Sequence, residues 1–199
     1  MGPTFAVFVS GTGRTLKYIA EDLDAGIIPG AIGLVVSSRD CPAVEFARER
    51  GIPTRVERGS IDAPSLVVML EEAGCTWVVL AGYTRLLPVP PALAGRMVNI
   101  HPALLPSFGG SGMYGARVHQ AVIDCGCRVS GCTVHLCDDA YDTGPIVAQA
   151  CCEVLPDDSA EALAARVFQL ERQTYPAALA ALFSARVSIT GRRVRIMPE

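Results

Sequence analysis

The sequence predicts an α/β protein with a Rossmann-like, doubly wound, mostly parallel sheet that has helices on both faces. One observation is that short apolar runs rich in β-forming residues alternate with segments whose apolar residues recur at helical spacing. A second is that these runs stop at turn residues, as the strands of βαβ units do. The chain of 199 residues is long enough for a sizeable core, and we expect a single domain, residues 1–199.

In the amino-terminal half, apolar runs predict strands and periodic segments between them predict helices. The expected strands are residues 4–9, 31–36, 52–56, 77–81 and 97–101. The expected helices are residues 16–23, 42–50 and 66–70. This alternation favours parallel pairing, and in such sheets ligands bind at the carboxyl ends of the strands.

The carboxyl-terminal half predicts further strands, two helical segments and a closing hairpin. The expected strands are residues 131–136 and 146–154, and the hairpin is residues 188–196. The helical segments are residues 116–123 and a long amphipathic region, 159–183, with Ser159 as its N-cap and an interruption near Pro176. The glycine-dense segment 107–115 is expected to be a loop, either a flap over a substrate or a solvated connection.

Composition and charge exclude several classes of protein. Half of the residues are hydrophobic and the net charge is −3, which argues against a disordered chain and against a nucleic-acid-binding surface. No apolar run reaches membrane-spanning length without charge, and the start of the chain lacks the pattern of a signal peptide. We expect a soluble, cytoplasmic protein with small-molecule substrates and no nucleic-acid or membrane partner, either a monomer or a homodimer.

The eight cysteines give no CxxC pair and no spacing typical of a zinc site. The chain is also not a small secreted scaffold that depends on disulfides. We therefore expect reduced, mostly buried thiols and no bound metal.

Two polar residues interrupt the apolar strand at residues 97–101. Asn99 and His101 are two positions apart, so both side chains point to the same face of a strand. One supplies an amide donor and the other an imidazole that changes charge near neutral pH. The pair is suited to stabilise an oxyanion and move a proton, and a hydrogen-bonded core pair is the alternative.

A glycine loop, Ser10-Gly11-Thr12-Gly13-Arg14-Thr15, separates the first predicted strand from the first predicted helix. This order directs backbone N–H groups and a helix N-terminus at an anion, and glycine allows a phosphate close to the backbone. The loop is neither a dinucleotide fingerprint nor a P-loop. It predicts either a phosphate site, on the same sheet edge as Asn99 and His101, or an ordinary turn.

An acidic turn, residues 138–145, follows the strand that contains His135. Acidic turns are commonly solvated, so most of its carboxylates are expected to be inert. His135 is positioned to support Asp142. We expect His119, in the helix at 116–123, to lie on the surface or to serve packing.

Four segments, in order along the chain, resemble motifs of the folate-dependent formyltransferase superfamily and, together, its glycinamide ribonucleotide branch. They are Val9-Ser10-Gly11-Thr12-Gly13, Leu80-Ala81-Gly82-Tyr83, Asn99-Ile100-His101-Pro102 followed by Leu104-Leu105-Pro106, and Tyr141-Asp142-Thr143-Gly144. The resemblance covers about residues 5–183. The loop at 108–115 is longer than in many members and is similar to that of one subgroup.

The resemblance implies an enzyme that transfers a formyl group from 10-formyltetrahydrofolate to the amine of 5-phosphoribosylglycinamide in de novo purine biosynthesis. It implies that Asn99, His101 and Asp142 are the catalytic set. Direct attack of the amine forms a tetrahedral intermediate, whose oxyanion Asn99 and a protonated His101 are expected to stabilise. Asp142 is expected to favour the imidazolium form of His101 and to relay a proton through water. No covalent enzyme intermediate is needed, so no role is expected for the cysteines.

The resemblance also implies two groups of binding residues. For the nucleotide substrate they are Gly11, Gly13, Arg14, Thr15 and Glu171. For the folate they are Thr84, Arg85, Leu86, Leu87, Asn99, Asp138, Asp139, Ala140, Tyr141 and Asp142. Many members have asparagine at the position of Thr15, which leaves the specificity for the acceptor open, and Glu171 is equally consistent with a solvated helix face.

Three alternatives stay open. A formyltetrahydrofolate hydrolase usually has an additional amino-terminal domain, and a methionyl-tRNA formyltransferase an additional carboxyl-terminal one. The first expected strand starts at Thr4 and the sequence ends at Glu199, so we expect neither. A non-catalytic nucleotide- or folate-binding module is a third possibility, which would not require Asn99, His101 and Asp142 together.

Overall fold

The computed structural model describes residues 2–184 and 186–197. Within these ranges the strands form a nine-stranded sheet in the order β3-β2-β1-β4-β5-β6-β7-β9-β8. Residues 1, 185, 198 and 199, which the predicted domain includes, lie outside the described residues.

The amino-terminal half alternates strands and helices, as predicted. Its strands are β1 (Thr4–Val9), β2 (Ala31–Ser37), β3 (Thr54–Val56), β4 (Trp77–Leu80) and β5 (Met97–His101). Its helices are α1 (Arg14–Asp24), α2 (Pro42–Glu49), α3 (Ala63–Glu72) and the short 3₁₀ helix η1 (Pro91–Leu93). All pairings among these strands are parallel, so the carboxyl ends of β1, β4 and β5 meet at one edge.

The carboxyl-terminal half adds antiparallel strands to this sheet. Its elements are α4 (Ala116–Asp124), β6 (Val129–Leu136), β7 (Ile146–Glu153), α5 (Ala160–Ser184), β8 (Arg186–Thr190) and β9 (Arg193–Met197). β6 pairs antiparallel to β5 in a register that sets His135 opposite Asn99. The predicted hairpin is β8–β9, and β9 joins the sheet beside β7.

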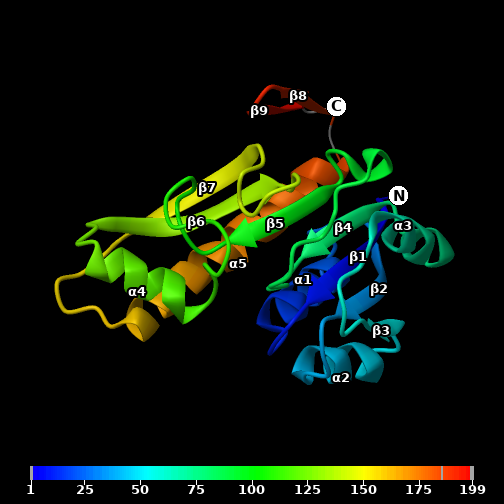
Figure 1. Ribbon diagram of the computed structural model, residues 1–199, viewed down its shortest axis with the longest axis horizontal. Coiled ribbons are helices and arrows are strands. Elements are labelled where there is room, and N and C mark those ends of the chain that lie inside the picture. Colours follow the sequence, from blue (N-terminus) through cyan, green and yellow to red (C-terminus); the bar gives the residue numbers. More distant parts are fainter. Residues whose placement is uncertain (1, 185, 198–199) are drawn as a thin grey trace.

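Helices cover both faces of the sheet, which confirms the predicted fold class (Figure 1). Along β1, Phe5, Val7 and Val9 belong to one hydrophobic core, together with side chains of α1, α2, α4 and α5. Ala6 and Phe8 belong to a second core, on the other face, together with side chains of α3. Because β1 is buried on both faces, its sequence is apolar throughout instead of alternating.

Helix α5 passes through Pro176 without a break, so the predicted interruption is wrong. Proline removes one helical hydrogen bond and costs about 3 kcal/mol in a helix interior. Burial offsets this cost, because the turns on both sides of Pro176 contribute to one core, for example with Val167 and Leu179. The predicted N-cap is confirmed: Ser159 Oγ accepts a hydrogen bond from the N–H of Ala162 at 3.2 Å.

All eight cysteines lie within the described ranges and are free thiols. The expectation that they are mostly buried is wrong, because only Cys75 and Cys132 are buried, and Cys125 and Cys151 are exposed. Cys151 is on the exposed face of β7, where every second residue faces outward.

Among the described residues, none of the helices combines the length and the apolar character that crossing a bilayer requires.

Candidate active site

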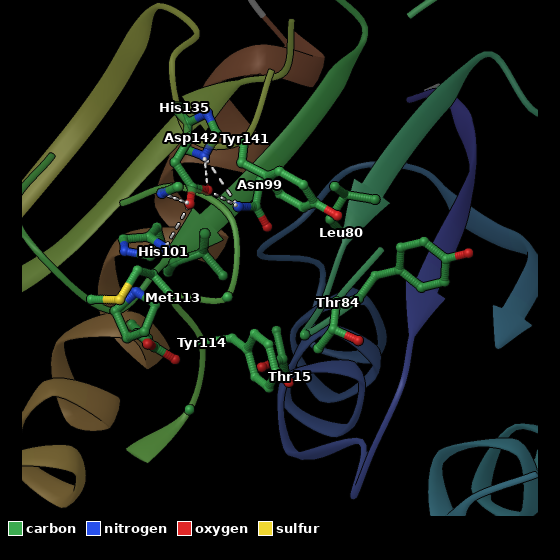
Figure 2. A pocket seen from close by; sticks show the side chains of 18 of the residues that line it. Thr15, Leu80, Thr84, Asn99, His101, Met113, Tyr114, His135, Tyr141 and Asp142 are labelled. Atoms are coloured by element: carbon green, nitrogen blue, oxygen red, sulfur yellow. Dashed lines mark hydrogen bonds and ion pairs between the residues drawn. The ribbon is translucent and has the colours of Figure 1, made fainter. Parts of the chain in front are cut away.

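The main cavity of the structure has a volume of about 450 Å³ and opens at the carboxyl ends of β4 and β5. Its wall is built from the starts of α1 and α4, one face of α5, the loop after β4 and the turn after β6. Figure 2 shows a polar group in this wall, which is made of Asn99, His101, His135 and Asp142. The sheet edge predicted from the strand order is therefore where the cavity lies.

Asn99 and Asp142 are joined directly. Asn99 Nδ2 lies 3.5 Å from Asp142 Oδ1 and 3.1 Å from His135 Nε2. His135 Nδ1 donates to the carbonyl oxygen of Leu136 at 3.1 Å, and its Nε2 also lies 3.5 Å from Asp142 Oδ1. The cross-strand register of β5 and β6 thus brings Asn99, His135 and Asp142 together, and His135 supports Asp142 as expected.

His101 lies between a carboxylate and a carbonyl. Its Nδ1 is 3.5 Å from Asp142 Oδ2, and its Nε2 donates to the carbonyl oxygen of Phe108 at 2.8 Å. A carbonyl can only accept, so Nε2 keeps its hydrogen in the neutral and in the charged ring. His101 consequently gains and loses its proton at Nδ1, the atom beside Asp142.

Burial decides the charge of His101. The side chain is only 3% exposed, and this burial lowers its pKa below the ordinary value, although Asp142 and the Phe108 carbonyl act in the opposite direction. Before substrates bind, the lowered pKa favours a neutral ring at pH 7, and a protonated His101 during the reaction stays a prediction. The carboxylate does favour the imidazolium as expected, but desolvation is the larger effect.

Asp142 is held as a carboxylate. Burial raises its pKa, but hydrogen bonding to His135, the charge of His101 and the N–H of Gly110 together bring the pKa below its ordinary value. The Gly110 N–H donates to Asp142 Oδ2 at 2.9 Å. The same carboxylate therefore contacts the loop, β6 and His101.

The glycine-dense loop packs against this group. A Cβ atom on Gly109 would lie 2.6 Å from Leu105 Cδ2 and 3.0 Å from Asp142 Cβ, so the close approach requires glycine. Gly110 and residues 112–115 line the cavity. The loop is thus a wall of the cavity, and its closure over a substrate stays a prediction.

Of the residues predicted for the nucleotide, Arg14, Thr15 and Glu171 line the cavity, whereas Gly11 and Gly13 are not among its lining residues. Gly13 has a φ of 74°, and a Cβ there would lie 2.8 Å from Ala43 Cβ. Turn geometry and the approach of α2 therefore explain this glycine without a ligand. The predicted phosphate contact of Gly11 and Gly13 has no support from the cavity.

Glu171 is half-buried and borders the cavity, so the alternative of a solvated helix face is wrong. Burial raises the pKa of Glu171 to about 7, and the Arg14 guanidinium opposes this rise. Arg14 itself lies over Phe168, 4.2 Å from the ring centroid. Near neutral pH the Glu171 carboxyl group can therefore both hold and release a proton.

The residues predicted for the folate line the cavity, with the exception of the exposed Asp139. The Leu86 N–H donates to Tyr141 Oη at 2.9 Å, which ties the loop after β4 to the turn after β6. Arg85 uses one guanidinium nitrogen to donate to the carbonyl oxygens of Glu57 and Gly59, at 3.1 and 2.7 Å. Asp138 accepts from Thr143 Oγ1 at 2.6 Å and so shapes the turn.

Sequence reasoning missed several lining residues, of which His119 is the most informative. His119 borders the cavity, and its burial contradicts the expected surface position but agrees with the alternative of a packing residue. A signal was available, because His119 precedes Val122 by three positions and thus lies on the apolar face of its helix. Met113, Tyr114 and Phe168 also line the cavity.

No group of metal-ligating side chains was found in residues 2–184 and 186–197, and the absence of a metal stays a prediction.

Comparison with known proteins places the chain in a family. The sequence matches the family described as "Formyl transferase" over residues 4–179. It is 42% identical over 192 residues to a protein of Arabidopsis thaliana named phosphoribosylglycinamide formyltransferase, chloroplastic, covering 92% of this chain and 66% of that protein. A protein of the same name from Vigna unguiculata is 42% identical over 191 residues, covering 92% of this chain and 61% of that protein. The chain therefore spans no more than about two thirds of these plant proteins.

A solved structure gives the same result. The crystal structure of glycinamide ribonucleotide transformylase 1 from Symbiobacterium toebii superimposes with a TM-score of 0.87 at 35% sequence identity. The match covers 98% of this chain and 94% of that chain. The resemblance and the fold class inferred from the sequence are confirmed.

Proposed function

Because the chain belongs to the formyl transferase family, we propose that it transfers a formyl group from 10-formyltetrahydrofolate to the amine of 5-phosphoribosylglycinamide. This step serves de novo purine biosynthesis. We propose that residues 1–199 act as a single formyltransferase domain. The observation that supports the activity best is the meeting of Asn99, His101 and Asp142 at the wall of one cavity.

We assign one side of the cavity to each substrate, so that the two substrates meet inside it. Thr84, Leu86, Leu87 and Tyr141 line the side that we propose for the folate. Arg14, Thr15 and Glu171 line the side that we propose for the phosphoribosylglycinamide. A volume of about 450 Å³ falls in the range of small-molecule sites. Much of the rate acceleration would come from holding the amine and the formyl carbon together.

In the proposed reaction the amine nitrogen attacks the formyl carbon, and the carbonyl oxygen becomes an oxyanion. One N–H of Asn99 turns from its 3.5 Å contact with Asp142 Oδ1 to this oxygen, and His101 Nδ1 supplies the second donor. Because the ring is neutral before reaction, Nδ1 takes up the proton that the attacking amine loses, and it gives this proton back when the intermediate collapses. The C–N bond to the folate then breaks, and the proton lost by the attacking amine ends on the folate nitrogen.

Asp142 has two proposed tasks. As a carboxylate 3.5 Å from His101 Nδ1, it stabilises the imidazolium that forms during the reaction. It also accepts a proton from the attacking amine through water and passes it on. Both tasks require the deprotonated form, which agrees with the low pKa of Asp142.

We propose that Glu171 binds the glycinamide amine and takes the proton that the ammonium form must lose before attack. A pKa of about 7 suits a general base at neutral pH. Arg14 is proposed to pair with the phosphate, since a guanidinium forms strong charge-assisted hydrogen bonds.

The formyl donor and the acceptor are the only ligands proposed, without a metal, a nucleic acid or a membrane surface. We propose the cytoplasm as the location and a monomer or homodimer as the assembly. Of the relatives described above, the two plant proteins are named as chloroplastic.

An assay with 10-formyltetrahydrofolate tests the activity, with phosphoribosylglycinamide, water alone or glycine amide as the acceptor. We expect one formylated nucleotide for each tetrahydrofolate released, and release only when the nucleotide is present. Equal release in water alone would identify a hydrolase instead. Binding of both ligands without any turnover would identify a binding module.

A further inference from the structure

All three histidines of the chain border the main cavity. His101 and His135 each have polar partners at both ring nitrogens. His119 differs from them: it is 4% exposed, and within the described part of the chain neither ring nitrogen has a hydrogen-bond partner. A buried polar group without a partner is unusual and calls for a ligand or a bound water.

The position of the His119 ring indicates which nitrogen is available. Nδ1 is the nitrogen that is fully enclosed, so the ring presents Nε2 to the cavity that it lines. Burial lowers the pKa of His119 and the charge of His101 lowers it further, so the ring is neutral. A hydrogen on the enclosed Nδ1 would have no acceptor, and this is less favourable than leaving Nδ1 unprotonated. The hydrogen of the neutral ring is therefore on Nε2. His119 is therefore a neutral donor that faces the cavity.

His119 lies on the acceptor side of the cavity. It is in the first turns of α4, which packs against α5, the helix that contributes Phe168 and Glu171 to the wall. The folate side is formed instead by the loop after β4 and the turn after β6. His119 and His101 line the same cavity, so a ligand that reaches His119 shares the cavity with the proposed catalytic group.

We propose that the Nε2–H of His119 donates a hydrogen bond to the carbonyl oxygen of the glycinamide. This inference rests on the proposed function, which supplies the acceptor. A neutral donor fits a neutral carbonyl oxygen, whereas the phosphate fits the cationic Arg14. Bonded in this way, His119 positions the acceptor so that its amine faces the formyl carbon.

The test replaces His119 by a ring that cannot donate. In His119→Phe we expect the KM for phosphoribosylglycinamide to rise about tenfold, as for the loss of one hydrogen bond, with the KM for 10-formyltetrahydrofolate unchanged. The thermal midpoint should be unchanged or higher, because no hydrogen bond within the protein is lost. His119→Gln, whose amide N–H reaches a similar position, should restore much of the affinity.

A second acceptor locates the bond. With an analogue that has a methylene in place of the glycinamide carbonyl, wild type and His119→Phe should have the same KM. Ser130→Ala is the matched control, because Ser130 is 2% exposed, has no hydroxyl partner among the described residues and borders a separate cavity of about 130 Å³. It should leave both KM values unchanged.

An unchanged acceptor KM in a folded His119→Phe would overturn the inference, as would a change in the folate KM instead. If His119→Phe does not fold, His119→Gln is measured in its place. A folded His119→Gln whose KM for phosphoribosylglycinamide rises by about tenfold overturns the inference as well. The wild-type assay distinguishes the two proposals. A wild type without acceptor-dependent turnover contradicts the proposed function. An active wild type with unaffected His119 variants contradicts only the role of His119.

Discussion

His101 Nε2 donates a hydrogen bond of 2.8 Å to the carbonyl oxygen of Phe108. This bond fixes the ring, because it leaves Nδ1 as the nitrogen that titrates and turns it toward Asp142 Oδ2 at 3.5 Å. The glycine-dense loop thereby determines where the proposed catalytic histidine takes up its proton. It also explains how a ring that is neutral at rest can become charged as the oxyanion forms.

Asp142→Asn should lower kcat and also lower the pKa of His101 further. Removing the carboxylate removes the charge that opposes the effect of burial on the imidazole. A histidine NMR titration of the wild type and the variant measures this change, with Asp139→Asn, an exposed site in the same turn, as the control. A His101 pKa that stays the same or rises would remove Asp142 from its proposed role.

Glu171 should make the protein less stable as the pH rises from about 5 to 8. A carboxyl group with a folded pKa of about 7, above its unfolded value near 4.5, binds more protons when folded, so its contribution is fully present below pH 4.5 and is lost by pH 7. The thermal midpoint of Glu171→Gln should therefore depend less on pH than that of wild type. Parallel curves for the two proteins would show that Glu171 has an ordinary pKa.

Arg14→Ala should raise the KM for phosphoribosylglycinamide and leave that for 10-formyltetrahydrofolate unchanged. The proposed phosphate contact is charge-assisted, so a rise of about tenfold or more is expected. Thr15→Asn should be neutral or mildly favourable for the same substrate, since an amide has two donors and a hydroxyl one. Steady-state kinetics that show weaker folate binding and normal nucleotide binding would mean that the two ligands are placed the wrong way round.

Blocking the exposed thiols should leave turnover intact. Cys125 and Cys151 are accessible, and neither is near the proposed catalytic group. Cys137 does line the cavity, but burial raises the pKa of its thiol, which makes the reactive thiolate rarer. Activity after treatment with a thiol reagent, in wild type and in Cys137→Ser, checks this. Rapid inactivation of Cys137→Ser would reveal an essential thiol elsewhere.

Much of the fold followed from local patterns in the sequence, because the buried strands are apolar runs and the helices repeat at their own period. The continuity of α5 did not, since Pro176 is tolerated only because the turns on both sides pack into the same core. The packing on both sides of Pro176 is a feature of the tertiary structure, so a short stretch of sequence cannot predict it.

The same limit applies to the site. The spacing of Asn99 and His101 placed them on one face, but the neutral charge of His101 depends on burial by segments distant in sequence. Gly13 resembled a phosphate contact, and its glycine is explained by the close approach of Ala43 on α2. His119 was not predicted as a site residue. Its proposed role follows from a buried Nδ1 without a hydrogen-bond partner, and a short stretch of sequence does not show this.

The central claim is that a protonated His101 Nδ1 stabilises the oxyanion. His101→Gln tests it most directly, because the amide can still donate to the Phe108 carbonyl but has no nitrogen that takes up a proton. The measurement is kcat at saturating concentrations of both substrates, together with the thermal midpoint. We predict a loss of about a hundred- to a thousandfold in kcat at a nearly unchanged midpoint. A His101→Gln variant with near-normal kcat would contradict the account.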